Sequence, residues 1–374
     1  MSASLFNLIS RLGYLWNDFH SFIIFYIFFF GIFLFIFLKL VKYRPGIWRT
    51  LGLNLIIFLF LAVNLFYGLE IYFRYFFDRT DNIFQIKTTQ RWKDRHVIIN
   101  AFSFRDDHFF IDKDPRELRI AVLGDSYTWG YGIKDRVNRW GDRLQQQLTK
   151  DCETKGKTVK VYNLAMPGMS TRDHTQLIND YVKKYKIDAI IIGYYMDDGN
   201  SDMTPRHIEP CYNRFFSYRY IPIVRDLINS SYALEFFYVR FYNRFIFPSF
   251  GDQCWTLSYE KQYSDPELWV RHLQRLQGII DYTRDNNVGL AFMMIPYLKF
   301  LSPNYPATDI HKRLVTFFEE NEVPVVDLLS IFSEYKPVDL MVNQNDYHAN
   351  ELGHQLASQA IYNKIKDNDK FTCH

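Results

Sequence analysis

The sequence predicts an α/β domain with a doubly wound, parallel five-stranded sheet, preceded by two transmembrane helices. Three observations support this prediction. The first 70 of the 374 residues contain two long apolar segments. Five short apolar runs then alternate with helical patterns, which is typical of a parallel sheet covered on both faces. The first run ends in Gly-Asp-Ser, at the edge where doubly wound sheets bind their ligands.

The two apolar segments are each long enough to cross a bilayer. Residues 19–41 and 51–70 reach the length of about 20 residues that a membrane-spanning helix needs. A cleaved signal peptide followed by a buried helix is the alternative. The first segment, however, exceeds the apolar region of a signal peptide, and it lacks the basic start and the small-residue cleavage site. We therefore expect a membrane anchor with two helices over residues 1–77.

The loop between these segments sets the expected topology. The stretch KLVKYRPGIWRT at 39–50, which includes the end of the first segment, carries the four cations Lys39, Lys42, Arg44 and Arg49. Short cationic loops stay in the cytoplasm. The domain over residues 78–374 is then expected on the other side of the membrane, in the periplasm or at the cell surface.

Overall composition narrows the function further. The charge is balanced, with 44 Lys+Arg against 41 Asp+Glu, and no basic run is interleaved with aromatic residues, so nucleic acid is not an expected partner. Cys152, Cys211, Cys254 and Cys373 allow three connectivities of two disulfides in an oxidising compartment. No Cys or His cluster has the spacing of metal ligands, and we expect neither a metal nor another cofactor.

The domain alternates between strand and helix patterns. The expected strands are apolar or β-branched runs bounded by turn residues, at 118–123, 159–163, 188–194, 289–295 and 323–328. The expected helices lie at 139–150, 170–185, 264–286, 307–321 and 350–365. An aromatic-rich insertion at about 197–262 interrupts the alternation. We expect a helical subdomain with a buried aromatic face there, with a substrate lid or a membrane-resting surface as alternatives.

Ser126 follows the first expected strand, within LRIAVLGDSYTWGYG. Gly124 and Gly130 allow a sharp turn there and leave the space above the hydroxyl open. Ser126 is therefore either a helix N-cap or a nucleophile. A serine nucleophile needs an adjacent base and a third group that orients this base.

The stretch NQNDYHANELGHQLA provides such a pair. Asp346 and His348 are two residues apart and precede a helix expected from about residue 350. A turn at this point could project His348 over the sheet edge that carries Ser126. His354 is the competing base, but we expect it to lie within the helix.

Four stretches resemble sequence blocks of the SGNH (GDSL-like) hydrolase superfamily. GDSYTWG at 124–130 is similar to the GDSxTxG signature, and DYHANELGH at 346–354 is similar to the C-terminal Asp/His block. NLAMPGMST at 163–171 resembles the second block, and NAFSFRDD at 100–107 resembles the approach to the nucleophile in bacterial members. The resemblance covers about residues 100–360 and implies the flavodoxin-like SGNH hydrolase fold.

The resemblance implies a role for each matched residue. Ser126 would attack an ester carbonyl, His348 would act as general base and then as general acid, and Asp346 would orient the imidazole. The backbone N–H groups of Ser126 and Gly168 would stabilise the oxyanion. Activity should then rise as His348 loses its proton, near pH 6–7 for an ordinary imidazole.

Two positions depart from the family pattern. Asp197, in GYYMDDGNSD, stands where the family has an Asn that donates to the oxyanion, and an ionised carboxylate cannot donate. Asn200 could supply the amide instead, Asp197 could be protonated, or the site could rely on two backbone donors; Asn200 is favoured. Asn345 stands where the family often has its Asp, three residues before the His, so Asp346 is the expected carboxylate.

The implied fold also bears on the cysteines. In the flavodoxin-like order, the helices at 139–150 and 350–365 pack on one sheet face and end on the side opposite the site. The preferred disulfide pairing is therefore Cys152–Cys373 with Cys211–Cys254.

Three functions fit these expectations. The first is a membrane-anchored, extracytoplasmic serine esterase or deacylase that removes O-acyl groups, O-acetyl above all, from cell-surface glycan or lipid. The second is an O-acyltransferase that uses the same triad to acylate an exported polysaccharide, with a multi-spanning membrane protein as acyl donor. The third is a non-catalytic glycan-binding or assembly protein on a hydrolase scaffold, because a fold alone does not prove activity.

Overall fold

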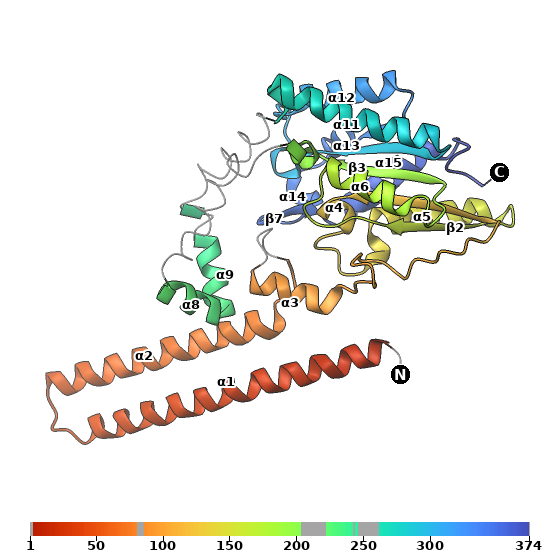
Figure 1. The fold of residues 1–374 in the computed structure, drawn as a ribbon. Helices are drawn as coiled ribbons and strands as arrows, with labels where there is room; N and C mark the ends of the chain where they lie inside the picture. The colour runs from red at the N-terminus through yellow and green to blue at the C-terminus, as the bar shows by residue number, and fades with distance from the viewer. Residues whose placement is uncertain (1–2, 81–85, 203–221, 242–243, 246–261, 374) are drawn as a thin grey trace. The chain divides into compact units, whose positions relative to one another are not determined.

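The computed structural model describes residues 3–80, 86–202, 222–241, 244–245 and 262–373 (Figure 1). The side chain of Asn200, both cysteines of the predicted Cys211–Cys254 pair and most of the predicted insertion lie outside this description. The chain divides into two compact units, Met1–Phe76 and Phe77–His374.

The first unit consists of two long apolar helices. They are α1 (Ala3–Val41) and α2 (Ile47–Ile71), and α2 continues into a π-helical turn, η1 (Tyr72–Phe76). The segments Ile23–Val41 and Ile47–Phe76 are long and apolar enough to cross a membrane. The two predicted membrane helices are therefore present as candidate spans, and the first helix begins well before its apolar segment.

Polar and aromatic contacts join α1 to α2. Asn64 on α2 accepts a hydrogen bond from Tyr26 Oη at 2.5 Å and donates to Phe60 O at 2.7 Å. The rings of Phe33 and Phe60 stack with their centroids 4.0 Å apart. Because a hydrocarbon environment offers no water, internal partners of this kind allow an amide to lie within an apolar helix pair.

The second unit is built on a five-stranded parallel sheet with the order β2-β1-β3-β4-β5, which confirms the predicted fold. The strands are β1 (Glu117–Gly124), β2 (Thr158–Asn163), β3 (Ala189–Tyr195), β4 (Gly289–Ile295) and β5 (Val325–Asp327). β3 and β4 are buried along their whole length, which explains their continuous apolar sequence. The strand order reverses at β1, so the crevice beside its carboxyl end is the expected ligand site.

Helices cover this sheet. The principal ones are α5 (Trp140–Glu153), α6 (Thr171–Tyr181), α11 (Pro266–Asp285), α12 (Thr308–Glu320) and α15 (Glu351–Ile365). α5 packs against α15, and α6 packs against α11 (Figure 1). Right-handed crossovers place these two pairs on opposite faces of the sheet.

Shorter helices occupy the connections. They are α3 (Lys87–His96), α4 (Ser126–Trp129), η2 (Arg136–Asn138), η3 (Met196–Asp202), α8 (Pro222–Ser230), α9 (Tyr232–Phe241), η6 (Leu298–Phe300), α13 (Leu328–Phe332) and α14 (Pro337–Leu340). η3, α8 and α9 lie in the described part of the aromatic-rich insertion.

A two-stranded antiparallel ribbon precedes α15. It consists of β6 (Met341–Asn343) and β7 (Asp346–Ala349). The sequence predicts only a turn here, because strands of three and four residues are too short to show an alternating pattern. The ribbon matters for the site, since residues two apart on a strand point to the same face.

Among the described residues, one disulfide closes the domain. Cys152, near the end of α5, is bonded to Cys373, and their Cα atoms are 5.3 Å apart. This is the pairing predicted for these two cysteines. Because α5 runs back from the carboxyl edge of the sheet, the bond lies at the edge opposite Ser126.

Candidate active site

Ser126 begins the helix α4, directly after the carboxyl end of β1. Asp125 is the N-cap of α4 and accepts a hydrogen bond from Tyr127 N at 2.9 Å. The N-cap role that the sequence left open for Ser126 therefore belongs to Asp125. Ser126 itself is only partly buried. The turn thus leaves the serine hydroxyl available for other contacts.

Glycines on β1 and β3 allow α4 to pack directly on the sheet. A Cβ atom at Gly124 or at Gly193 would lie 2.2 Å from Thr128 Oγ1, far inside van der Waals contact. The Thr128 side chain therefore fills the space that both glycines leave. This contact explains the Gly and the Thr of the GDSYTWG stretch by close packing.

The structure brings Ser126, His348 and Asp346 into one hydrogen-bonded chain. Ser126 Oγ lies 2.8 Å from His348 Nε2, and His348 Nδ1 lies 2.5 Å from Asp346 Oδ1. Asp346 and His348 share a face of β7, which lets one short strand supply both groups. Asp346 lies two residues before His348, where the family often has its Asp three residues before. The extended backbone of β7 allows the shorter spacing.

Aromatic rings surround the imidazole. The centroids of Tyr127 and Tyr131 lie 5.1 Å and 4.6 Å from that of His348. Tyr127 Oη also donates to Tyr347 O at 2.8 Å, which ties α4 to β7. Sequence reasoning missed both tyrosines, although their spacing of four residues within the nucleophile block was a usable signal.

Burial and charge act in opposite directions on the pKa of Asp346. Full burial would raise this pKa, but the charge of the neighbouring His348 and its hydrogen bonds outweigh that effect, with a smaller contribution from the nearby Thr80 hydroxyl, and hold the pKa below the ordinary value. Asp346 is therefore ionised at neutral pH, and it can stabilise a positively charged imidazole.

Two other buried carboxylates, those of Asp125 and Asp198, have a raised pKa instead of a lowered one. Burial raises the pKa of Asp125 to about 7, with a further increase from the charge of Asp197. Burial, followed by the charges of Asp125 and Asp197, raises the pKa of Asp198 well above its ordinary value. Asp125 and Asp198 thus retain protons at pH values where exposed carboxylates have lost them.

The predicted oxyanion residues lie at the ends of β2 and β3. Gly168 is exposed in the loop before α6, has a φ of +82°, and has open space where a Cβ would lie. Asp197 is the second residue of η3, and its carboxylate accepts a hydrogen bond from Tyr297 Oη. Asn200 is also in η3, and its side chain lies outside the described residues.

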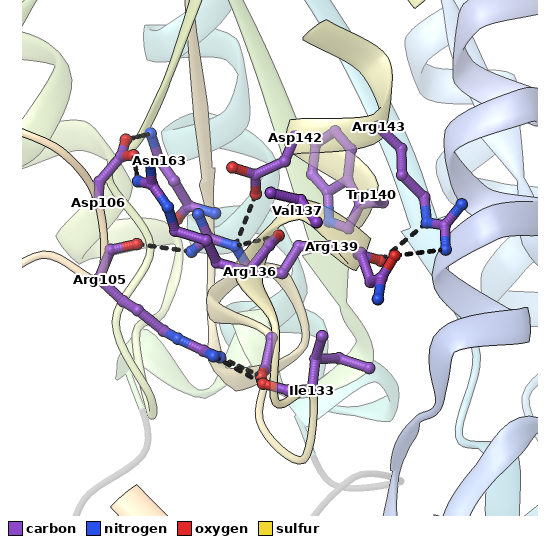
Figure 2. Close-up of polar contacts among 12 residues, drawn as sticks. Arg105, Asp106, Ile133, Arg136, Val137, Arg139, Trp140, Asp142, Arg143 and Asn163 are labelled. Carbon is purple, nitrogen blue, oxygen red and sulfur yellow. Dashed lines mark hydrogen bonds and ion pairs between the residues drawn. The ribbon is translucent and has the colours of Figure 1, made fainter. Parts of the chain in front are cut away.

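A buried arginine holds the loop that follows α4 (Figure 2). Arg105 donates from Nη1 to Gly130 O and from Nη2 to Ile133 O, both at 2.6 Å. Arg139 donates from Nη1 to Arg105 O at 2.7 Å and from Nε to Asp142 Oδ2 at 2.7 Å. A guanidinium fork can satisfy several carbonyls at once, which gives the Arg of the NAFSFRDD stretch a structural reason.

The next residue connects the same stretch to β2 (Figure 2). Asp106 accepts a hydrogen bond from Asn163 N at 2.6 Å and forms an ion pair with Arg136 at 3.0 Å. The Asn163 side chain in turn donates to Thr128 O at 2.9 Å. Three of the resembling blocks therefore meet at the turn that presents Ser126.

His354, the competing base, lies elsewhere. Its Nδ1 accepts a hydrogen bond from Trp140 N at 3.1 Å, so it caps the start of α5. Burial and nearby arginines lower its pKa to about 3, which keeps the ring neutral. Among the described residues, no cluster of three or more His, Cys, Asp or Glu could hold a metal ion.

The chain is similar to one protein family and to several solved structures. A model of the GDSL-like lipase/acylhydrolase family matches residues 122–356. Three similar solved structures are TesA, the psychrotrophic esterase EstA from Pseudoalteromonas sp. and the acetylxylan esterase Axe2 from Geobacillus stearothermophilus. Their identities are 13%, 14% and 14%, with TM-scores of 0.40, 0.38 and 0.39. They cover 66%, 66% and 68% of this chain, and 98%, 96% and 96% of their own. No curated protein matches the chain.

The strand order and the position of Ser126 define a flavodoxin-like α/β protein with a serine at the switch point of its sheet. Because the family model covers more than half of the sequence, the chain belongs to the GDSL-like lipase/acylhydrolase family, as the resemblance to SGNH hydrolases predicts. This membership supports an acylhydrolase that acts on carboxylic esters.

Proposed function

We propose that the protein is a serine esterase in which Ser126 is the nucleophile, His348 the general base and acid, and Asp346 the orienting carboxylate. The observation that carries this proposal is the chain of two hydrogen bonds, of 2.8 Å and 2.5 Å, from Ser126 Oγ through the imidazole to Asp346. Geometry of this kind activates a hydroxyl that is otherwise a weak nucleophile.

The proposed reaction has two steps. His348 Nε2 takes the proton of Ser126 Oγ while this oxygen attacks the ester carbonyl, and it then gives the proton to the leaving alcohol. The ionised Asp346 stabilises the imidazolium in between. Water then attacks the acyl group on Ser126, with His348 again as the base. His348 returns this proton to Ser126 Oγ as the bond to the acyl group breaks, and the acid leaves.

Two backbone donors are proposed for the oxyanion. The Ser126 N–H lies at the start of α4, and the Gly168 N–H belongs to a loop with open space around it. One such donor typically contributes about 3 kcal/mol to the transition state. Asp197 already accepts from Tyr297, so the proposal does not depend on a donor from its side chain.

The substrate and the location are proposed from the N-terminal unit. Two apolar helices joined by a cationic turn support a two-pass anchor with the domain outside the cytoplasm. The Cys152–Cys373 disulfide is typical of proteins in oxidising compartments. We therefore propose O-acyl, above all O-acetyl, esters of cell-surface glycan or lipid as substrates.

The test uses the full chain in detergent micelles, with p-nitrophenyl acetate and a serine-reactive fluorophosphonate. We expect wild type to hydrolyse the ester and to be labelled. Ser126→Ala should lose labelling and at least about 10³-fold in kcat/KM. Ser330→Ala is the matched control, because Ser330 is exposed and lies outside the site.

The outcomes separate the three functions. An unlabelled, inactive wild type would leave only the non-catalytic glycan-binding or assembly function. Labelling with little hydrolysis would favour the O-acyltransferase, in which a sugar hydroxyl takes the place of water and a multi-spanning membrane protein supplies the acyl group. Hydrolysis that persists in Ser126→Ala would contradict the assigned nucleophile.

A further inference from the structure

We infer that Thr80 is a positioning residue for Asp346 and extends the hydrogen-bonded chain of the site to a fourth member. This inference rests on the proposed function. Thr80 belongs to the linker, here defined as residues 77–80, which directly follows the N-terminal apolar unit. The active site would then be completed by a segment about 45 residues before the nucleophile.

The buried hydroxyl of Thr80 lies near the carboxylate of Asp346. Thr80 is fully buried, and its hydroxyl lies close enough to Asp346 to help lower the pKa of that carboxylate. Thr80 Oγ1 and Asp346 Oδ2 are both buried, and neither has a hydrogen-bond partner among the described residues. His348 occupies Oδ1, so a hydroxyl directed to the second oxygen would fix the plane of the carboxylate.

A backbone contact fixes the linker next to Asp346. Asn343 Nδ2 donates to Thr80 O at 2.6 Å. Asn343 Oδ1 accepts from Asn345 N at 2.9 Å and from Asp346 N at 3.0 Å. One amide side chain therefore holds both the linker and the turn from which Asp346 begins.

Gly132 provides the space for this approach. A Cβ atom at Gly132 would lie 3.2 Å from Thr80 Oγ1 and 2.3 Å from Val342 Cγ2. The φ of +84° at Gly132 is also one that side-chain-bearing residues rarely adopt. The last glycine of the GDSYTWGYG stretch thus lets the linker and β6 come close to the nucleophile block.

Ion pairs secure the other end of the linker. Asp78 pairs with Lys134 at 2.7 Å and with His96 at 2.8 Å. These partners belong to the loop after the nucleophile block and to the end of α3. Contacts on both sides of Arg79 therefore hold Thr80 in place.

The test compares Thr80→Val with Thr80→Ser in the full chain, using p-nitrophenyl acetate. Val has the shape of Thr without its hydroxyl, whereas Ser keeps the hydroxyl and loses a methyl group. We expect Thr80→Val to lower kcat about tenfold with KM unchanged. We expect Thr80→Ser to retain kcat within about twofold, and both variants to unfold within a few degrees of wild type.

The results distinguish this inference from the proposed function. An active wild type with equal kcat in Thr80→Val overturns the positioning role and leaves the esterase intact. Equal losses in Thr80→Val and Thr80→Ser also overturn it, because packing and not the hydroxyl would then be responsible. A wild type that neither hydrolyses nor is labelled overturns both proposals.

Discussion

His348 and His354 are both buried and six residues apart in sequence, but their ring nitrogens have different hydrogen-bond partners. His348 faces a carboxylate that is held ionised, and a serine hydroxyl lies at its other nitrogen. His354 faces the backbone N–H of Trp140 and the charges of several arginines. Burial alone therefore does not indicate that a histidine acts as a general base. The hydrogen-bond partners of its two ring nitrogens do.

Substitution of His354 should affect mainly stability, whereas substitution of His348 should affect mainly activity. His354→Leu removes the acceptor for Trp140 N, and we expect it to lower the free energy of unfolding by about 1–3 kcal/mol while leaving kcat within about twofold. His348→Leu should lower kcat at least about 10³-fold and change stability little. Denaturant unfolding and ester hydrolysis measure both. A folded His354→Leu protein without activity would contradict this assignment.

Asp125 should make stability fall as pH rises. Its pKa is raised to about 7 in the folded chain, above the value of an unfolded Asp, so the folded state binds the extra proton between about pH 4 and pH 7. That contribution is present at low pH and is lost as pH rises through the folded pKa.

Asp125→Asn keeps an oxygen for the N-cap and cannot ionise. We expect its gain in unfolding free energy over wild type to be small near pH 4 and to grow towards pH 8. Asp226→Asn, at an exposed carboxylate, is the control and should show no such trend. Parallel pH curves for Asp125→Asn and wild type would refute the argument.

At the scale of elements, the site depends on how closely α4 approaches the sheet. The Thr128 side chain lies between Gly124 and Gly193, and Asn163 holds the carbonyl of Thr128 from β2. The geometry of Ser126 is therefore set by contacts along three adjacent strand ends. A small displacement of α4 would lengthen the contact between Ser126 and His348.

Gly193→Ala tests this dependence. The new methyl group would lie 2.2 Å from Thr128 Oγ1, so α4 has to shift. We expect a loss of about 1–3 kcal/mol in unfolding free energy and at least about a tenfold loss of kcat. Gly278→Ala is the control. A Cβ atom added at Gly278 on α11 would have no neighbouring group within 4 Å, and we expect this variant to gain up to about 1 kcal/mol in unfolding free energy. Unchanged kcat in Gly193→Ala would contradict the argument.

The regular elements were predictable from local pattern, whereas several site contacts were not. β1 to β4 and the long helices carry enough residues for apolar periodicity to appear, and the motifs predicted that Ser126, Asp346 and His348 lie together, as they do. The ribbon β6–β7 is too short for such a pattern. Thr80 and Asn343 could not be found from sequence, because their roles depend on contacts across about 260 residues.

At the scale of the molecule, one covalent bond ties the end of the chain to the domain. Cys373 and Cys152 are 221 residues apart, and both are buried. A loop of this length restricts the unfolded chain strongly. The bond also anchors the segment after α15, where Phe371 is fully buried in the core.

Removing this bond should affect stability more than activity. We expect the double variant Cys152→Ser/Cys373→Ser to lose about 2–5 kcal/mol of unfolding free energy. Its kcat at 25 °C should stay within about twofold of wild type, because the bond lies at the sheet edge opposite Ser126. Thermal unfolding and ester hydrolysis check the two statements, and a folded double variant that has lost its activity would show that the bond acts on the site.

The same bond makes the chain its own indicator of membrane orientation. Thiols in the cytoplasm stay reduced, whereas those exported from it oxidise. If intact cells are treated with a thiol-blocking reagent and then lysed, the electrophoretic mobility of the unreduced chain records the side on which Cys373 folded. No fused protein is needed, and a form in which Cys152 and Cys373 are fully alkylated would place the domain in the cytoplasm.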